Sequence, residues 1–189
     1  MKLSKEQAAR NREKILTVAS RLFRQRGIDN VSVAEVMEAA GFTHGGFYNH
    51  FADKGALALE ACVTTFARSV SAVQDRTATG LEPYVKTYLS PAHRDGEDGC
   101  PITALATEAA RHDGLQAAFA EGLVSTVELF AEALQRSGVT ARGAARTRAM
   151  RLVSEMVGAL TLARAVRVAE PRLSNELLRA SRQAVESSG

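Results

Sequence analysis

The apolar positions of this chain recur with a helical period, and between residues 31 and 54 they predict a short helix, a glycine turn and a second short helix. The buried stripe of the first helix consists of Val33, Val36, Met37 and Ala40, at the spacing i, i+3, i+4, i+7. Ser32 precedes the stripe and Glu35 follows three residues later, which is the pattern of a capping box. Gly41 is placed to end this helix in a left-handed conformation, with Phe42 folded back on Met37.

The second short helix combines an inward aromatic pair with an outward polar row. Thr43 is expected to cap this helix, and Phe47 and Phe51 lie four residues apart on its inner side. The outward row is His44, Gly45, Tyr48, Asn49 and His50. Two helices joined by a tight glycine-containing turn, with a polar second helix, are typical of a helix-turn-helix. The pattern therefore predicts a DNA-binding element.

The remaining periodic segments predict an all-α protein of about nine helices. The first helix is expected over residues 5–26, ended by Gly27, with the buried stripe Ala8, Ile15, Val18, Ala19, Leu22 and Phe23. Further helices are expected over residues 54–77, 81–89, 100–112, 115–136, 140–168 and from 171 onward. Residues 90–99 are polar and turn-rich and predict a loop.

Two of these helical segments have unusually broad apolar surfaces. The helix at 54–77 has a wide arc formed by Leu57, Leu59, Cys62, Val63, Phe66, Val70 and Val73, which predicts packing on two sides and a connecting role. The last two helices carry broad Ala, Leu, Val and Met faces. Such faces either complete the core of one chain or pair with a twin in a twofold-symmetric four-helix bundle.

Composition and charge narrow the class of protein. The chain is 46% apolar and 24% charged, the balance of an ordinary globular protein. We expect a cytoplasmic protein without membrane contact, because we find neither a secretory signal nor ~20 successive uncharged apolar residues. Two cysteines fit a reducing compartment. Residues 1–54 hold nine Lys/Arg and six Asp/Glu, which is the whole net excess of +3, and residues 55–189 balance at 15 of each. DNA phosphates favour such a basic excess, although chance remains the alternative.

Residues 15–57, ILTVASRLFRQRGIDNVSVAEVMEAAGFTHGGFYNHFADKGAL, resemble the tetracycline-repressor (TetR/AcrR) family of bacterial transcriptional regulators. The resemblance is carried by Ser-Val-x-x-apolar-x-x-x-Ala-Gly followed by Phe-Tyr-x-His-Phe-x-x-Lys. It implies a homodimer joined through its last two helices, with a three-helix DNA-binding domain at 1–53 and a helical ligand-binding and dimerisation domain at 54–189. It further implies a repressor that is released from a pseudo-palindromic operator by a small-molecule effector.

The resemblance also implies roles for single residues. Base edges are expected to face Thr43, His44 and Gly45. Phosphate contacts are expected from Tyr48, His50 and Lys54, a contact of either kind from Asn49, and a hydroxyl or amide contact from Ser32. Other interpretations remain: Tyr48 or His50 can belong to the core, and the pair Gly45-Gly46 can serve internal packing instead of close approach to DNA.

The expected effector pocket lies inside the helical body. Its candidate residues are Phe66, Val70, Tyr84, Tyr88, Cys100, Leu105, Phe119, Leu123 and Val127. Ordinary core packing is the alternative for each of them. The low charge of this set suggests an apolar or aromatic ligand.

Cys100 is the other group with candidate chemistry. It precedes a helix start, where a thiolate is stabilised, so a thiol-based redox or electrophile sensor with Cys62 as partner is an alternative function. The nearby acidic residues Asp95, Glu97 and Asp98 oppose it. The same residues with His93, Cys100 and His112 lack a closed metal-ligand spacing, so we expect neither metal nor cofactor. No base is placed near Cys100, which leaves a small Cys-dependent enzyme or a helical interaction protein as remote alternatives and predicts a non-enzyme.

Overall fold

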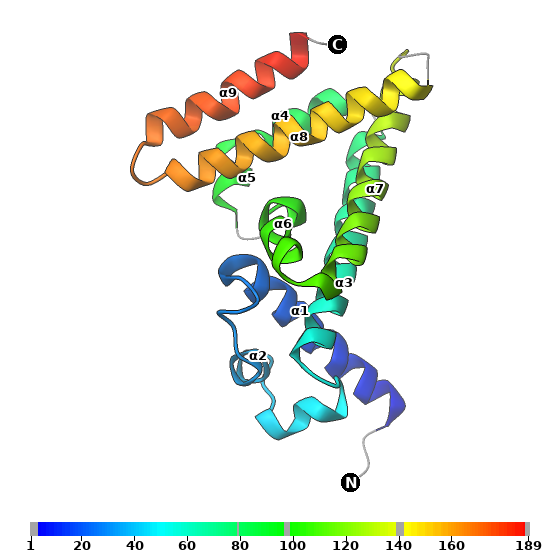
Figure 1. Ribbon diagram of the computed structural model, residues 1–189, viewed down its shortest axis with the longest axis vertical. Coiled ribbons are helices and arrows are strands. Elements are labelled where there is room, and N and C mark those ends of the chain that lie inside the picture. The colour runs from blue at the N-terminus through cyan, green and yellow to red at the C-terminus, as the bar shows by residue number, and fades with distance from the viewer. Residues whose placement is uncertain (1–3, 79, 97–98, 139–141, 188–189) are drawn as a thin grey trace. The chain divides into compact units, whose positions relative to one another are not determined.

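The computed structural model describes residues 4–78, 80–96, 99–138 and 142–187. All regular secondary structure in these residues is helical. The helices are α1 (Lys5–Arg26), α2 (Val33–Ala39), the 3-10 helix η1 (His44–Asn49), α3 (Lys54–Thr77), α4 (Leu81–Tyr88), α5 (Pro91–Asp95), α6 (Pro101–Arg111), α7 (Asp113–Arg136), α8 (Arg142–Val166) and α9 (Pro171–Ser187). The predicted all-α class, with a helix-turn-helix head and a helical body, is confirmed (Figure 1).

The chain forms two compact units. The first unit comprises residues 1–67 and 104–120, and the second comprises 68–103 and 121–189. Helices α3, α6 and α7 therefore contribute residues to both units. The expected domain division after residue 53 stays a prediction.

Helix α1 begins and ends at the signals that the sequence contains. The Ser4 side chain accepts a bond from the Gln7 amide at 3.1 Å, and the helix ends at Gly27, whose φ is 80°. Its buried residues are Ile15, Leu16, Ala19, Ser20 and Phe23. The predicted stripe was wrong at its edges: Ala8, Val18 and Leu22 are only half-buried, and Leu16 is buried instead. The buried face is thus rotated slightly from the expected one.

Helix α2 is delimited by two local devices, both predicted from the sequence. Ser32 and Glu35 form a reciprocal capping box at its start. At its end, the Phe42 amide donates to the Met37 carbonyl at 2.8 Å, and the Gly41 amide donates to Glu38 at 2.9 Å. These two bonds and a φ of 76° at Gly41 make a Schellman motif. The motif sets the direction in which the chain leaves α2 toward η1.

Helix α3 buries most of its predicted wide apolar arc, including Leu57, Cys62, Phe66 and Val73. By length and composition it is the one described helix that passes the test for a membrane span. Its first half nevertheless packs in the first unit, where the Ser20 hydroxyl donates to the Ala61 carbonyl at 3.4 Å and Arg12 pairs with Glu60. The predicted two-sided arc was wrong at Leu59 and Val63, which are 38% and 50% exposed. This distribution is typical of a core helix with one open face.

A short helix interrupts the segment that we expected to be a loop. Ser90 caps α5 by accepting a bond from the His93 amide at 3.2 Å, and Pro91 occupies the first turn. The loop prediction was therefore wrong for residues 91–95, because Ser-Pro is also a helix-start signal and a five-residue helix has no readable period. Glu97 and Asp98 lie outside the described residues.

In the second unit, α8 and α9 pack against each other as a helical hairpin (Figure 1). The Ser174 hydroxyl of α9 donates to the Ala163 carbonyl of α8 at 2.6 Å. The buried residues of α8 are Ala145, Ala149, Leu152, Val153, Met156, Leu160 and Ala163. Met150, one of the apolar residues of the broad face predicted for this helix, is 44% exposed, and the predicted helix start at Thr140 lies outside the described residues.

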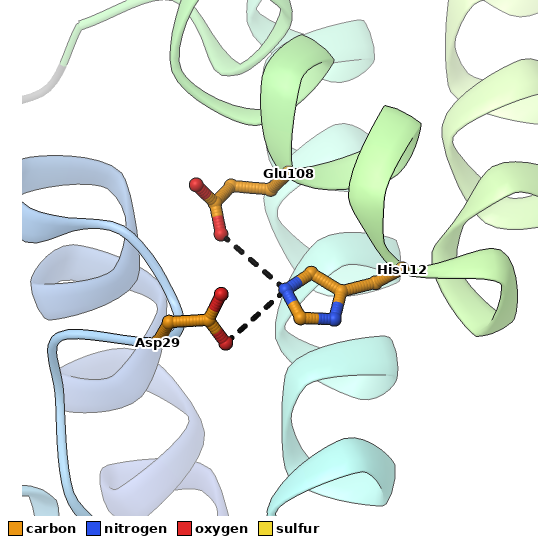
Figure 2. A group of neighbouring side chains, drawn as sticks. All are labelled: Asp29, Glu108 and His112. Atoms are coloured by element: carbon orange, nitrogen blue, oxygen red, sulfur yellow. Dashed lines mark ion pairs between the residues drawn. The ribbon is translucent and has the colours of Figure 1, made fainter.

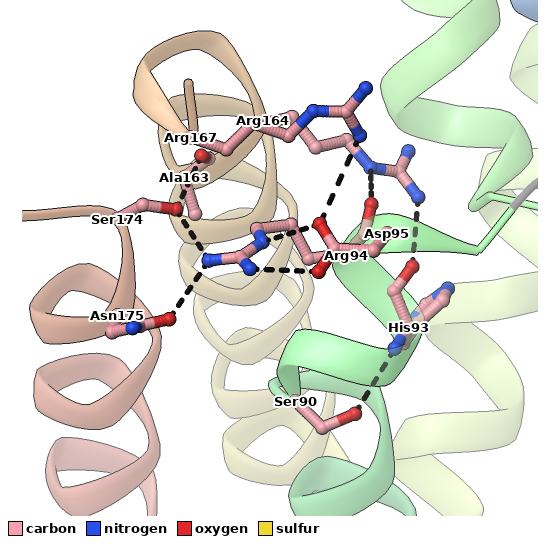
Figure 3. A network of polar contacts seen from close by, with 9 residues as sticks. All are labelled: Ser90, His93, Arg94, Asp95, Ala163, Arg164, Arg167, Ser174 and Asn175. Atoms are coloured by element: carbon pink, nitrogen blue, oxygen red, sulfur yellow. Dashed lines mark hydrogen bonds and ion pairs between the residues drawn. The ribbon is translucent and has the colours of Figure 1, made fainter. Parts of the chain in front are cut away.

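Two arginines fasten α5 to this hairpin (Figure 3). Arg164 of α8 donates to the backbone carbonyls of Arg94 and His93, both at 3.1 Å. Arg94 in turn donates to Ser174 at 2.7 Å and to Asn175 at 2.9 Å. One guanidinium from each side thus satisfies several acceptors, which holds α5, α8 and α9 together.

Candidate DNA-binding surface and effector site

The outward surface of η1 is held in place by two buried aromatic rings. Phe47 is fully buried, and its ring stacks on that of Phe51 with centroids 5.6 Å apart. The Arg12 guanidinium of α1 lies 4.6 Å from the Phe51 ring centroid, at cation–π distance. These contacts fix η1 against the first unit, so the opposite side of η1 has a defined orientation.

The geometry of η1 differs from the expected helix in one respect. It is a 3-10 helix, and no side-chain bond from Thr43 caps it. The predicted capping role of Thr43 was wrong. The first turn closes instead through the backbone, where the Gly46 amide donates to the Thr43 carbonyl at 3.0 Å. The Thr43 side chain is exposed beside the outward row.

The predicted outward residues do lie at the surface. His44, Gly45, Tyr48 and Asn49 are exposed, and His50 is half-buried. Tyr48 is 67% exposed and meets its neighbours only at ring edges, 5.3 Å from Phe47 and 6.4 Å from His44. The alternative that Tyr48 is a core residue is therefore excluded. The surface of η1 presents hydroxyl, imidazole and amide groups on one rigid element.

The two glycines of η1 have different surroundings. A Cβ at Gly46 would touch the Met37 side chain at 3.6 Å, an ordinary packing distance. A Cβ at Gly45 would meet nothing within 4 Å, and neither glycine has a positive φ. Internal packing and backbone conformation therefore do not explain the glycine at position 45.

Ser32 and Lys54, the other predicted DNA contacts, lie at helix starts. The Ser32 hydroxyl donates to the Glu35 carboxylate at 2.8 Å, and the Ser32 amide donates to the same oxygen at 2.8 Å. Hydrogen bonds from the Ser32 amide and hydroxyl, and then from Arg26, lower the Glu35 pKa to about 2. The hydroxyl of Ser32 is thus already engaged in the capping box. Lys54 is the half-buried first residue of α3, next to the capping residue Asp53.

The nine predicted pocket residues are divided between the two units. Phe66, Leu105 and Phe119 belong to the first unit, where the rings of Phe66 and Phe119 meet edge to face at 5.4 Å. The second unit holds Val70, Tyr84, Tyr88, Cys100, Leu123 and Val127. The assignment of all nine to one pocket stays a prediction.

Tyr84, Tyr88 and His93 form an aromatic cluster in the second unit. Tyr88 is 6% exposed and lies 5.9 Å from Tyr84 and 4.6 Å from His93, centroid to centroid. Its buried hydroxyl makes no hydrogen bond of full geometry among the described residues, and the nearby Cys100 thiol is its only candidate partner there. Burial, and then the neighbouring Cys100, raises the Tyr88 pKa, while burial lowers the His93 pKa. The cluster is therefore a neutral aromatic wall with one unsatisfied polar group.

The cysteines offer less chemistry than the sequence suggested. Cys62 and Cys100 are both buried and unpaired. Burial raises the pKa of the Cys62 thiol, which makes it a poor nucleophile for resolving an oxidised partner. Of the residues considered as metal ligands from the sequence, His93, Asp95 and Cys100 lie in the second unit. His112 lies in the first unit, where it approaches Asp29 and Glu108. Sequence reasoning missed this trio, although Glu108 and His112 have the i, i+4 spacing of neighbours on a helix.

The fold and the exposed polar surface of η1 are those of a helix-turn-helix protein, and the family comparisons identify it as a transcriptional regulator. Residues 15–61 match the model for bacterial regulatory proteins of the tetR family, and residues 87–176 match that of the LmrA/YxaF-like transcriptional regulator C-terminal domain. The chain belongs to the TetR/AcrR family. Members of this family bind DNA operators and small-molecule effectors, typically as dimers.

The named relatives match a short segment of the chain rather than its full length. A segment of 54 residues is 46% identical to the HTH-type transcriptional regulator AcrR of Shigella flexneri and 41% identical to the repressor BepR of Brucella suis. It covers 29% of this chain but only 25% and 26% of those relatives, about a quarter of their length.

Solved structures match nearly the whole fold. Reduced NemR of E. coli has a TM-score of 0.80 at 19% identity, covering 94% of this chain and 96% of that one. A TetR-family regulator of Cytophaga hutchinsonii has a TM-score of 0.78 at 19% identity, covering 99% and 98%. At this identity the likeness concerns the fold alone.

Proposed function

We infer that this regulator is a repressor, which binds a pseudo-palindromic operator as a homodimer and is released by a small molecule. The observation that carries the DNA-binding half is the exposed row of η1, which Phe47 and Phe51 hold rigidly from the inner side. A rigid polar surface of this kind suits the major groove, where hydrogen-bonding groups at base edges distinguish the base pairs.

Within this surface we assign two kinds of contact. Thr43, His44 and Gly45 at the start of η1 face base edges, and the open space at Gly45 permits close approach of the backbone. Tyr48, His50 and Lys54 bind phosphates, and Asn49 binds a phosphate where it does not reach a base. Ser32 makes a hydroxyl or amide contact to the extent that its hydrogen bonds to Glu35 permit one. Lys54 also lies at the start of α3, where the helix dipole adds to its charge.

The dimer is supported by apolar side chains that the single chain leaves exposed at its C-terminal hairpin. Leu162 is 56% exposed on α8, Leu173 is 44% exposed on α9, and Val168 lies in the turn between them. A second copy of the same hairpin would bury these side chains in a four-helix bundle. Two linked heads then reach half-sites about one helical turn, or a multiple of it, apart.

The effector site is supported by the unsatisfied hydroxyl of Tyr88. A buried polar group without a partner costs free energy, and a ligand that supplies the missing bond recovers it. Because the rings of Tyr84 and His93 lie beside Tyr88, and that of Phe130 lies beside Tyr84, we assign an aromatic effector that carries one hydroxyl or carbonyl group. Thiol sensing at Cys100 is the competing function, and it predicts that Cys100→Ser abolishes the response to an oxidant or electrophile.

The DNA-binding half is tested by fluorescence anisotropy on the DNA upstream of the protein's own gene. Affinity should fall steeply with salt, since Lys54 and its neighbours displace counterions from phosphate. Lys54→Ala should weaken binding on every sequence and reduce the salt slope by about one. Lys86→Ala removes an exposed lysine from α4 and is the matched control. Salt-independent binding, or equal losses in the two variants, would refute the assignment.

The effector half is tested with aromatic compounds that carry a single hydroxyl or carbonyl. A compound that releases the wild type from DNA should bind Tyr88→Phe about 10-fold more weakly, the equivalent of one hydrogen bond of ~1.4 kcal/mol. Lys86→Ala again serves as the control. If Tyr88→Phe is released by every such compound as readily as the wild type, the site lies elsewhere.

A further inference from the structure

We propose that Asp29, Glu108 and His112 form a binding site for a divalent transition metal of the Zn²⁺ type (Figure 2). All three belong to the first compact unit. Asp29 lies in the turn between α1 and α2, Glu108 in the last turns of α6, and His112 at the junction of α6 and α7. One ligand atom of each lies within 4.8 Å of the other two.

The spacing of the His112 and Asp29 ligand atoms matches that of neighbouring ligands on one metal ion, and the Glu108 oxygen lies slightly farther away. His112 Nε2 lies 3.3 Å from Asp29 Oδ1 and 3.8 Å from Glu108 Oε2. This nitrogen is buried but makes no bond of hydrogen-bond geometry. Metal–ligand bonds of 2.0–2.2 Å in a tetrahedral zinc site place neighbouring ligand atoms about 3.3–3.6 Å apart. A metal between the three side chains therefore satisfies the orphaned nitrogen, and water can complete the coordination.

The charge of the trio also favours a bound cation. The Glu108 side chain is only 8% exposed, and a buried carboxylate requires neutralisation. The Arg111 guanidinium lies 3.9 Å from Glu108 Oε1, the oxygen that does not face His112. A divalent ion would balance the charges of the Asp29 and Glu108 carboxylates. With the ion bound, the two carboxylates carry no uncompensated negative charge.

The ligand atoms are also oriented and accessible. The Ile28 amide donates to Glu108 Oε2 at 3.0 Å, which fixes the carboxylate in the way that outer bonds orient metal ligands. A pocket of about 540 Å³ opens beside the trio, and its lining includes Asp29, His112, Asp113 and Lys54. An ion can enter from this pocket, although Lys54 and Arg111 lower the affinity for any cation by repulsion.

A metal at this site would link the end of α6 to the turn that precedes the capped start of α2. This consequence rests on the proposed function, because it concerns the placement of the DNA-binding helices. Metal occupancy would restrict that turn and would therefore change operator affinity through linkage between the two sites.

The binding claim is tested without DNA, so its outcome is separate from that of the proposed function. The metal-free full chain is titrated with ZnCl₂ by calorimetry and with CoCl₂ by absorption spectroscopy. We expect one ion per chain, a tetrahedral Co²⁺ spectrum without a thiolate charge-transfer band, and no uptake of Mg²⁺, which prefers six oxygen ligands. A thiolate band, or no stoichiometric binding, overturns the site.

Variants locate the ion and test its effect. His112→Gln and Glu108→Gln should weaken Zn²⁺ binding at least tenfold, and the glutamine at 108 can still accept the Ile28 amide. Glu38→Gln, which changes an exposed carboxylate of α2 in the same unit, is the matched control and should bind like the wild type. Equal binding by His112→Gln and the wild type refutes the site. If Zn²⁺ binds tightly but operator affinity is the same with and without it, the linkage to DNA is refuted.

Discussion

The adjacent residues Phe47 and Tyr48 predict opposite results when they are mutated, because one faces inward and the other faces outward. Phe47 is fully buried, and Phe47→Ala should destabilise the fold by about 3–5 kcal/mol through lost burial and the cavity left behind. That is a large share of the roughly 5–15 kcal/mol by which a typical domain is stable. Tyr48→Phe removes only a hydroxyl from a ring that is 67% exposed, and should change stability by less than about 0.5 kcal/mol.

DNA binding should show the reverse order once folding is accounted for. A hydrogen bond to a charged group contributes about 1.5–3 kcal/mol, so Tyr48→Phe should weaken operator binding roughly 10- to 100-fold. Stability is measured by urea unfolding followed by circular dichroism, and affinity by anisotropy at fixed salt. Unchanged DNA affinity of Tyr48→Phe would refute the phosphate contact. A stable Phe47→Ala would refute the inward anchor.

Three further predictions concern the elements that support the two sites. Gly41→Ala should destabilise the protein by about 1–2 kcal/mol in urea unfolding, because φ is 76° there, and a loss below about 0.5 kcal/mol would contradict the Schellman geometry. Glu35, whose pKa is lowered to about 2, should stabilise the protein fully above its ordinary pKa of 4.5 and lose this effect as the pH falls through 2. The stability difference between wild type and Glu35→Gln should therefore shrink over that range, and a pH-independent difference speaks against the capping box. Arg164→Lys should cost about 2 kcal/mol, since one ammonium cannot keep all the bonds of the guanidinium to α5, and an unchanged urea midpoint would show that the network carries no stability.

The elements that could be predicted from the sequence are those with local causes. The capping box at Ser32 and the glycine stop at Gly41 depend on residues within a few positions of each other, so their spacing alone was sufficient. The inward pair Phe47 and Phe51 followed from helical spacing in the same way. Once Phe47 and Phe51 were assigned to the inner side, the other residues of η1 had to face outward, which is why the exposed surface was correctly expected.

The features that were missed depend on segments that are distant in sequence. Leu59 and Val63 are apolar but exposed at the edge of the arc that α3 buries, and no pattern within α3 records where that arc ends. Arg164 bonds to α5 across a long stretch of chain, and Asp29 meets Glu108 only because α6 returns to the first unit. Thr43 was assigned a capping bond that the 3-10 geometry of η1 replaces with a backbone bond.

The central claim is that the outward row of η1 selects a DNA sequence, and selection of bound fragments from the source genome tests it most directly. The wild type should enrich fragments with two related half-sites about one helical turn, or a multiple of it, apart. The double variant His44→Ala/Tyr48→Ala, checked to be folded by circular dichroism, should lose this enrichment. No enrichment by the wild type, or enrichment of the same fragments by the double variant, would contradict the account.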